Sequence, residues 1–219
     1  LGGPAPYWTS WTTDTIGKTT KRIDRTPSAA STTTYDYASN GEGAVRPHFV
    51  TGTSTTGSAP GSASYAADAA GNTTGRPAPG GGTQTLVWDE LNHLTDVTKD
   101  GASVASMVYD AAGTRVLRKQ GDTTTLYLGG NEISLNTATN VVSANRYYTH
   151  AGQTVAVRTG GSNDTVTTLI SDWQGTTHHQ VLNATGALST TWQDPYGATR
   201  GTPPTAWTGE RGFVGGTKD

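Results

Sequence analysis

Apolar residues in this chain come in short alternating stretches, and each stretch ends at a turn-forming residue. Between residues 153 and 158, for example, Val155 and Val157 share one face and polar neighbours share the other. A period of two residues is typical of half-buried β-strands. Similar stretches at 115–119, 123–128, 166–170, 179–182 and 187–192 predict further strands joined as hairpins. We therefore expect an all-β fold in which repeated antiparallel hairpins form a curved or spiralling sheet.

A longer period runs through the same chain, because an Asp returns about every 21 or 22 residues and Gly stands three positions after it. A fixed period of this size indicates an array of supersecondary units. The aligned positions are Asp14, Asp36, Asp68, Asp89, Asp110, Thr149, Asp172 and Asp194, at spacings of 22, 32, 21, 21, 39, 23 and 22 residues. Six of them are followed by glycine (Gly17, Gly71, Gly113, Gly152, Gly175 and Gly197), and Asn92 replaces it once. Ser39 matches poorly, with Asn40-Gly41 after it as a displaced turn.

The chemistry of this signature predicts a tight turn. An Asp side chain accepts hydrogen bonds from backbone N–H groups two residues on, and Gly supplies the positive φ that closes the loop. The aromatic residue before the Asp is expected to end a strand and to pack against its counterpart in the next unit. We therefore interpret these Asp residues as turn formers rather than as general acids or metal ligands.

Composition limits the function classes. Of 219 residues, 32% are hydrophobic and 29 are Gly, so a conventional two-layer core would be thin. The net charge of -2 is dispersed, which argues against a nucleic-acid interface. No stretch is long and apolar enough to span a bilayer, and the absence of Cys excludes disulfides and thiol catalysis. Because the chain begins at Leu1, we expect a piece of a longer secreted or cell-surface protein.

Two segments interrupt the pattern. Residues 51–64 consist almost wholly of Thr, Ser, Gly, Ala and Pro, and residues 76–82 are rich in Pro and Gly. We interpret both as surface loops inserted into the array. The expected organisation is a hairpin array over residues 1–160 and a C-terminal segment over 161–219, continuous with it.

No pattern of catalytic or metal-binding residues stands out, and we expect neither enzyme activity nor a cofactor. His178 and His179 are adjacent and point to opposite faces of a strand, so they do not readily share one metal ion. His48, His93 and His150 lack the spacing of zinc ligands. No nucleophile elbow or phosphate-binding loop occurs, and the few Glu residues are scattered.

The six Trp residues allow two interpretations. They can form an interlocking row between repeats, or they can stack on sugars at an exposed surface. We favour the first for Trp11, Trp88, Trp173 and Trp192. Trp8 and Trp207 lie outside the regular strand positions, so they are the candidates for an exposed, glycan-stacking role.

The repeat signature and the C-terminal third resemble the YD-repeat family of RHS proteins, which is related to the shell of animal teneurins. The stretches that carry the resemblance, in the family's order and spacing, are Leu169 to Gly175, Asn183 to Gly186, Trp192 to Gly197 and Arg211 to Asp219. The segment 161–219 is in these terms the RHS-associated core.

The resemblance implies a β-ribbon that spirals into a hollow shell, and bacterial members commonly enclose a C-terminal toxin released by self-cleavage beside an Asp-Pro-rich motif. Asp194-Pro195 belongs to an earlier motif, so no cleavage residues carry over. The partners implied are the rest of the parent shell and an enclosed C-terminal segment. The alternatives are a surface adhesion or carbohydrate-binding module that uses exposed Trp residues to bind a cell-surface glycan or protein, and, less favoured, a polysaccharide hydrolase.

Overall fold

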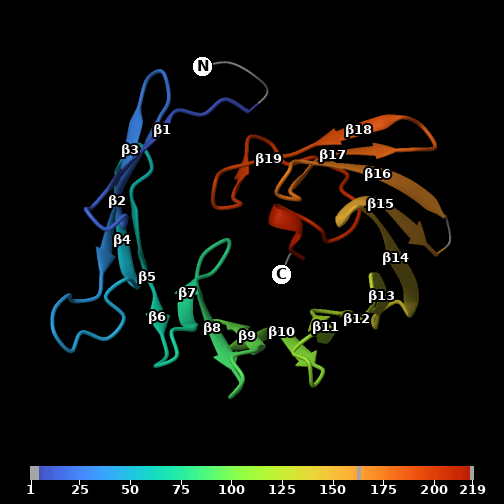
Figure 1. Ribbon diagram of the computed structural model, residues 1–219, viewed down its shortest axis with the longest axis horizontal. Helices are drawn as coiled ribbons and strands as arrows, with labels where there is room; N and C mark the ends of the chain where they lie inside the picture. Colours follow the sequence, from blue (N-terminus) through green and yellow to red (C-terminus); the bar gives the residue numbers. More distant parts are fainter. Residues whose placement is uncertain (1–4, 162–163, 218–219) are drawn as a thin grey trace. The chain divides into compact units, whose positions relative to one another are not determined.

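The computed structural model describes residues 5–161 and 164–217, and within them the chain is built almost entirely from antiparallel β-strands (Figure 1). It divides into two compact units. Unit 1 comprises Tyr7–Tyr109, and unit 2 comprises residues 110–217 together with Ala5 and Pro6. The predicted fold class, repeated antiparallel hairpins in an all-β protein, is confirmed.

Unit 1 begins with a five-stranded sheet in which each strand pairs with the next one along the chain. Hydroxyl groups pair across its strands, since the Thr33 and Thr55 Oγ1 atoms lie 2.8 Å apart. Such polar cross-strand pairs contribute to sheet stability where apolar side chains are few. The strands are β1 (Thr9–Thr13), β2 (Thr19–Arg25), β3 (Ala30–Tyr37), β4 (Val50–Gly57) and β5 (Gly61–Ser64).

The predicted loop at 51–64 is wrong, because these residues form most of β4 and all of β5. The prediction looked for alternating apolar residues, whereas here Thr supplies both the β-branched shape and the cross-strand hydroxyl contacts. The second predicted loop, 76–82, is only partly a loop. A strand extends to Pro77, and the turn from Ala78 to Gly82 closes with the Ala78 N–H donating to the Gly82 carbonyl at 2.9 Å.

The remainder of unit 1 is a meander in which successive strands pair antiparallel. It contains β6 (Ala66–Ala67), β7 (Thr73–Pro77), β8 (Thr83–Trp88), β9 (Leu94–Lys99) and β10 (Ala102–Tyr109). Its buried apolar residues include Ala78, Leu86, Val97 and Met107.

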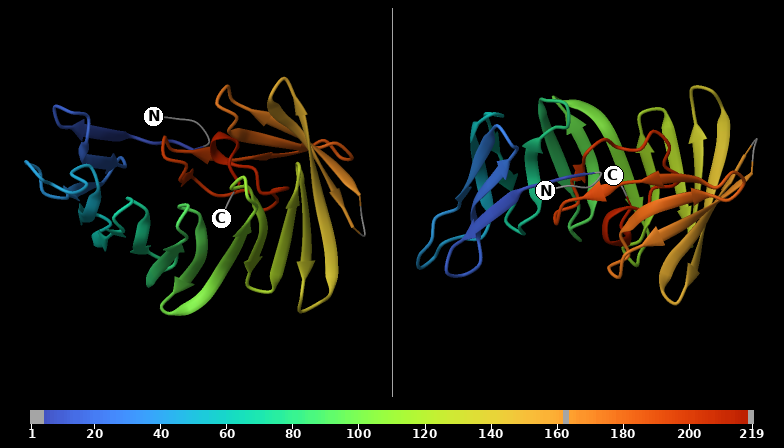
Figure 2. Two further views of the ribbon diagram at one scale, coloured as in Figure 1. Left: turned by 60° about the horizontal axis from the view of Figure 1, so that its bottom comes forward. Right: turned by 90° about the horizontal axis from the view of Figure 1, so that it is seen from above.

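Unit 2 contains the meander strands β11 to β18, followed by a short two-stranded ribbon and one turn of 3-10 helix, η1 (Figure 2). The stretches predicted as strands in this part of the chain all overlap strands, but the predicted stretch 187–192 is divided between β18 and β19, which lie in different sheets. The bounds are β11 (Arg115–Gln120), β12 (Thr123–Leu128), β13 (Asn131–Asn136), β14 (Val141–His150), β15 (Gln153–Gly160), β16 (Thr165–Ser171), β17 (Thr177–Leu182), β18 (Ala187–Thr190), β19 (Trp192–Gln193), β20 (Thr199–Arg200) and η1 (Phe213–Gly215).

The boundary between the two compact units falls at a different residue from the boundary between the two segments expected from the sequence. The division falls between Tyr109 and Asp110 rather than after residue 160. At residue 160 itself the sheet continues, because β15 pairs directly with β16. Strands β16 to β18 are thus part of the same meander as the strands that precede them.

One face of the unit 2 sheet, here called the inner face, carries a mixed polar and apolar interior. Val157 and Leu169 are its buried apolar residues. The C-terminal segment 205–217, here called the tail, lies against this face (Figures 1 and 2). The buried polar residues on the same face are Arg118, Thr125, Glu132, Thr167, Thr177 and Gln180. The core is therefore thin, as the composition predicts, and much of it depends on hydrogen bonds.

Candidate functional sites

Six of the aligned Asp residues build the same turn. In each turn, one carboxylate oxygen of the Asp accepts hydrogen bonds from the backbone N–H groups of the residues two and four positions later. At Asp68 only the residue four positions later donates. The Asp backbone N–H donates to the carbonyl four residues on, and the N–H three residues on donates to the Asp carbonyl. The six are Asp14, Asp68, Asp89, Asp110, Asp172 and Asp194.

The residue three positions after each of these Asp residues has the positive φ that the turn requires. At Gly113 the angle is 77°, and at Asn92, the one non-glycine in the series, it is 64°. Asn adopts this left-handed conformation more readily than other non-glycine residues. Gly17, Gly71, Gly175 and Gly197 have values between 87° and 95°.

Two positions of the predicted series do not form this turn. Asp36 lies inside β3 opposite Gly52, so the predicted turn at Asp36 is wrong, and the connection to β4 instead spans residues 38–49. At Thr149 the turn is a two-residue hairpin, in which Ala151 and Gly152 have φ of 49° and 80°. Gly152 is thus a turn residue, but of the tight hairpin kind.

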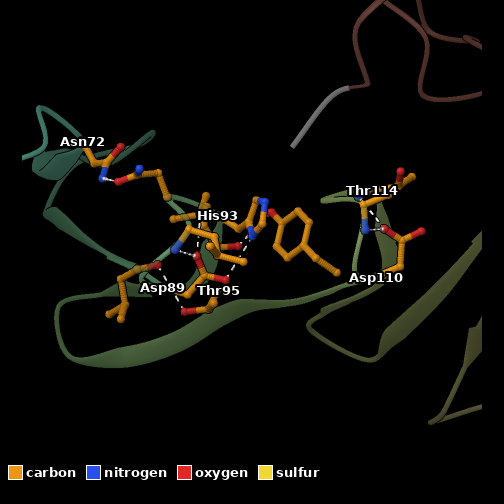
Figure 3. Close-up of polar contacts among 12 residues, drawn as sticks. Asn72, Asp89, His93, Thr95, Asp110 and Thr114 are labelled. Carbon is orange, nitrogen blue, oxygen red and sulfur yellow. Dashed lines mark hydrogen bonds and ion pairs between the residues drawn. The ribbon is translucent and has the colours of Figure 1, made fainter.

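The turn at Asp89 also uses its second carboxylate oxygen (Figure 3). His93 N–H and Leu91 N–H donate to Oδ1 at 2.8 and 2.9 Å, and His93 Nδ1 lies 3.1 Å from Oδ2. The pKa of the Asp89 carboxyl is lowered, mainly by the His93 backbone N–H. The His93 ring in turn stacks on Tyr109, with ring centroids 4.7 Å apart. The turn therefore fixes a side chain that packs on the next aromatic residue of the series.

The aromatic residues make a contact that the sequence reasoning missed. Trp88 Nε1 donates to the carbonyl of Thr73 at 2.8 Å, and Tyr109 Oη donates to that of Leu94 at 2.9 Å. Each acceptor stands five residues after the preceding Asp of the series. The aromatic side chain thus connects the end of one repeat to the first strand after the previous Asp turn. Equal offsets from the repeated Asp are the sequence signal that could have revealed it.

The structure places the two candidate glycan-stacking residues differently. Trp8 is exposed over 48% of its surface, with the Arg25 guanidinium 5.4 Å from its ring. Trp207 is only partly exposed, and its indole nitrogen is buried. Trp173, which we assigned to the interlocking row, is exposed over 85% of its surface. The exposed indoles are therefore Trp8 and Trp173.

The His residues do not assemble a metal centre within the described part of the chain, where no group of three or more metal-ligating side chains occurs. His178 Nε2 lies 3.2 Å from Asp172 Oδ2, and His179 Nδ1 lies 2.9 Å from Thr190 Oγ1. Both rings also contact the ring of Trp192. These contacts join one Asp turn to the start of the next.

A second polar cluster holds the tail against the inner face of unit 2. Tyr147 Oη donates to Glu132 at 2.9 Å and accepts the backbone N–H of Glu210 at 2.7 Å. The Glu210 carboxylate accepts Tyr127 Oη at 3.0 Å and pairs with the Arg118 guanidinium. Three strands of the sheet are thereby connected to one residue of the tail.

Burial shifts the ionisation of this cluster. Desolvation raises the pKa of Glu132, with the Glu210 charge adding to the effect, while the Tyr147 hydroxyl opposes it. Desolvation and the Glu210 charge raise the pKa of Tyr127 to about 12. Desolvation also raises the pKa of Tyr147, so both phenols stay protonated and act as donors near neutral pH.

Further along the tail, two more contacts continue the attachment. Gln180 donates to the Thr208 carbonyl and accepts its N–H, both at 2.8 Å, as a strand partner would. The Val214 N–H donates to Thr176 Oγ1 at 2.9 Å. Chemically, the Asp turns and the tail contacts are both suited to holding backbone groups in place by hydrogen bonds. Sequence reasoning missed the tail cluster because its partners are separated by 63 to 92 residues.

These features define an all-β repeat protein whose turns are fixed by Asp. No protein-family model matches the chain, and its sequence matches no curated protein. Its fold is similar to that of the TcdB2-TccC3 crystal structure, with a TM-score of 0.63 and 14% identity. The complex of TcdB2-TccC3 with Cdc42 gives 0.62 and 14%, and the form lacking the hypervariable C-terminal region gives 0.62 and 15%.

Each of these matches covers 96% of this chain but only 13% of the other. The chain thus shares the fold of a segment of the TcdB2-TccC3 chain. No helix in the described residues is long and apolar enough to cross a membrane.

Proposed function

We propose that this chain is a wall segment of a shell of the RHS type, in which YD-like repeats enclose and deliver a C-terminal effector. The observation that carries the proposal is the attachment of the tail to the inner face of unit 2. In a longer parent protein, a segment joined to the tail would start from the inner face, which lies opposite the exposed face of the sheet. In this role the repeat Asp residues act as turn formers and no residue is catalytic.

The fold similarity supports this proposal. One of the similar crystal structures was determined without its hypervariable C-terminal region, which shows that the related protein has a variable segment at that end. A variable segment after a constant wall is what delivery of different effectors requires. The partners proposed are the remaining repeats of the parent protein and the enclosed segment, and the site of action is outside the producing cell or at its surface.

The test is electron microscopy of the complete parent protein with an affinity tag at the end of its C-terminal segment, combined with protease treatment. A closed hollow particle in which the tag is protected until the particle is denatured would support the proposal. A tag on the outer face of the same particle is the matched control, because it should be cut at once. An open particle with both tags cut equally fast would overturn enclosure.

A second candidate, a glycan-binding surface, is favoured by the exposed indoles of Trp8 and Trp173. Exposed Trp faces stack on sugar rings. Retention of the intact chain on polysaccharide resins, lost in Trp8→Ala or Trp173→Ala but kept in Trp88→Phe, would support it. Equal elution of all four proteins would remove it.

A further inference from the structure

Glu132 is an acidic residue buried among uncharged partners. It lies on the inner face of β13 and is exposed over only 5% of its surface. Its carboxylate accepts the Tyr147 hydroxyl at 2.9 Å and the Asn145 amide at 3.4 Å. Within the described residues no Lys or Arg forms an ion pair with it. A buried carboxylate without a cation is costly, and it lowers that cost by taking up a proton.

Two charged residues of the tail, Glu210 and Arg211, contact the Tyr147 side chain that is hydrogen-bonded to this carboxyl. Glu210 shares the Tyr147 hydroxyl with Glu132, and its own carboxylate pairs with Arg118 and Tyr127. The Arg211 guanidinium lies 5.3 Å from the centre of the Tyr147 ring. On the sheet side, the Arg115 guanidinium lies 4.8 Å from the centre of the Tyr127 ring.

We propose that Glu132 is a proton-operated latch, which holds the tail firmly on the inner face when its carboxyl is protonated and loosens it when the carboxyl is ionised. The latch would control how readily the tail leaves the sheet. The proposal concerns only the attachment of the tail, so it holds or fails independently of the enclosing role.

The direction of the pH dependence follows from a comparison of the attached and detached states of the tail. With the tail in place, burial and the Glu210 charge raise the pKa of Glu132, although Tyr147, Asn145 and Arg211 act against them. When the tail leaves, Glu132 regains water and loses the repulsion from Glu210, so its pKa falls toward the ordinary value. The attached state therefore binds a proton at higher pH than the detached state. Attachment strengthens as the pH falls through the raised pKa and levels off near 4.5, by at most about tenfold per pH unit.

Hydrogen exchange of the tail measures this attachment directly. We would measure the protection of residues 208–212 in the intact chain from about pH 8 to about pH 5, corrected for the intrinsic exchange rate. Protection should rise on acidification in the unmodified chain. Glu132→Gln should give high protection at every pH, and Glu42→Gln, a change of an exposed carboxyl in unit 1, should keep the response.

A second measurement needs no variant. Carboxyl-carbon NMR follows the ionisation of Glu132, and the amide signal of Glu210 reports the hydrogen bond to Tyr147. A common midpoint above 4.5 for both signals is the expected result. The latch would be overturned if the amide signal of Glu210 did not change as Glu132 titrates. It would also be overturned if the tail of Glu132→Gln kept the pH response of the unmodified chain.

Discussion

At the scale of single residues, the Asp turn works because one carboxylate oxygen serves backbone N–H groups that otherwise have no partner. At Asp89, Oδ1 accepts two of them, and Oδ2 remains for His93. Hydrogen bonds to a charged acceptor are stronger than those between neutral groups. The same arrangement lowers the pKa of Asp14, Asp68 and Asp172. At these four turns the folded state therefore favours the charged form of Asp.

Substitution of Asp89 tests this preference. Asp89→Asn keeps an oxygen that accepts the two N–H groups but loses the charge, so near pH 7 its melting temperature should fall less than that of Asp89→Ala. Because the folded pKa of Asp89 is depressed, its contribution is present above the ordinary value of 3.8 and is lost as the pH falls below it. The gap in melting temperature between the unmodified chain and Asp89→Asn should therefore close in acid. A gap that is constant down to about pH 2 would contradict the charge argument.

At the scale of elements, the hairpin between β4 and β5 depends on one glycine. Gly57 has φ of 99°, and a Cβ there would overlap the carbonyl oxygen of Ala30 on β3. Gly57→Ala should lower the free energy of unfolding by roughly 2 kcal/mol. Gly61→Ala is the matched control, because that residue has ordinary φ and open space, and its effect should stay within about 0.5 kcal/mol. Urea unfolding of the two variants is the measurement that tests this prediction. Equal unfolding midpoints would show that Gly57 on β4 does not lie against Ala30 on β3.

The same strands show where sequence reasoning stops. Local turn chemistry predicted six Asp turns and part of the strands of unit 2, namely β11, β12 and β15 to β18, because Asp, Gly and alternating Val residues carry that information within a few positions. Thr51 to Ser64 contains no apolar alternation. Its two strands follow only from pairing, of β4 with β3 and of β5 with β4, which no local pattern records. Asp36 matched the period but falls within β3 for the same reason. The tail cluster depends on contacts between residues far apart in the sequence, so local patterns could not predict it either.

Among the contacts that attach the tail to the inner face, the Tyr147 hydroxyl joins Glu132 to the backbone of Glu210. Tyr147→Phe removes the donor to Glu132 and the acceptor for the Glu210 N–H, so two buried groups lose a partner. The expected loss is about 1–3 kcal/mol in the free energy of unfolding, with faster exchange of the tail amides. Tyr148→Phe, on the opposite and exposed face of β14, should have little effect on either. Equal behaviour of the two variants in urea and in hydrogen exchange would remove Tyr147 from the attachment.

At the scale of the whole molecule, a sheet that ends in solvent offers its unpaired backbone groups to another chain. β1 is such an edge of the five-stranded sheet, and it is short of charge because its residues are Thr, Ser and Trp. With a net charge of only -2, long-range repulsion between copies is weak. The isolated chain should therefore associate as its concentration rises, whereas in a longer protein of repeats a neighbouring strand would cover this edge.

Two Glu substitutions separate edge pairing from other contacts. Thr12 on β1 and Thr34 on β3 are both exposed and both stand directly opposite Lys21, so Glu at either position gains the same cross-strand charge pair. Only Thr12→Glu places the charge on the edge strand. It should weaken association by about tenfold, equivalent to about 1.4 kcal/mol, in sedimentation velocity, and Thr34→Glu should not. If both variants associate like the unmodified chain, contact occurs elsewhere, and exposed aliphatic residues such as Leu128 and Val142 on unit 2 become the surface to change next.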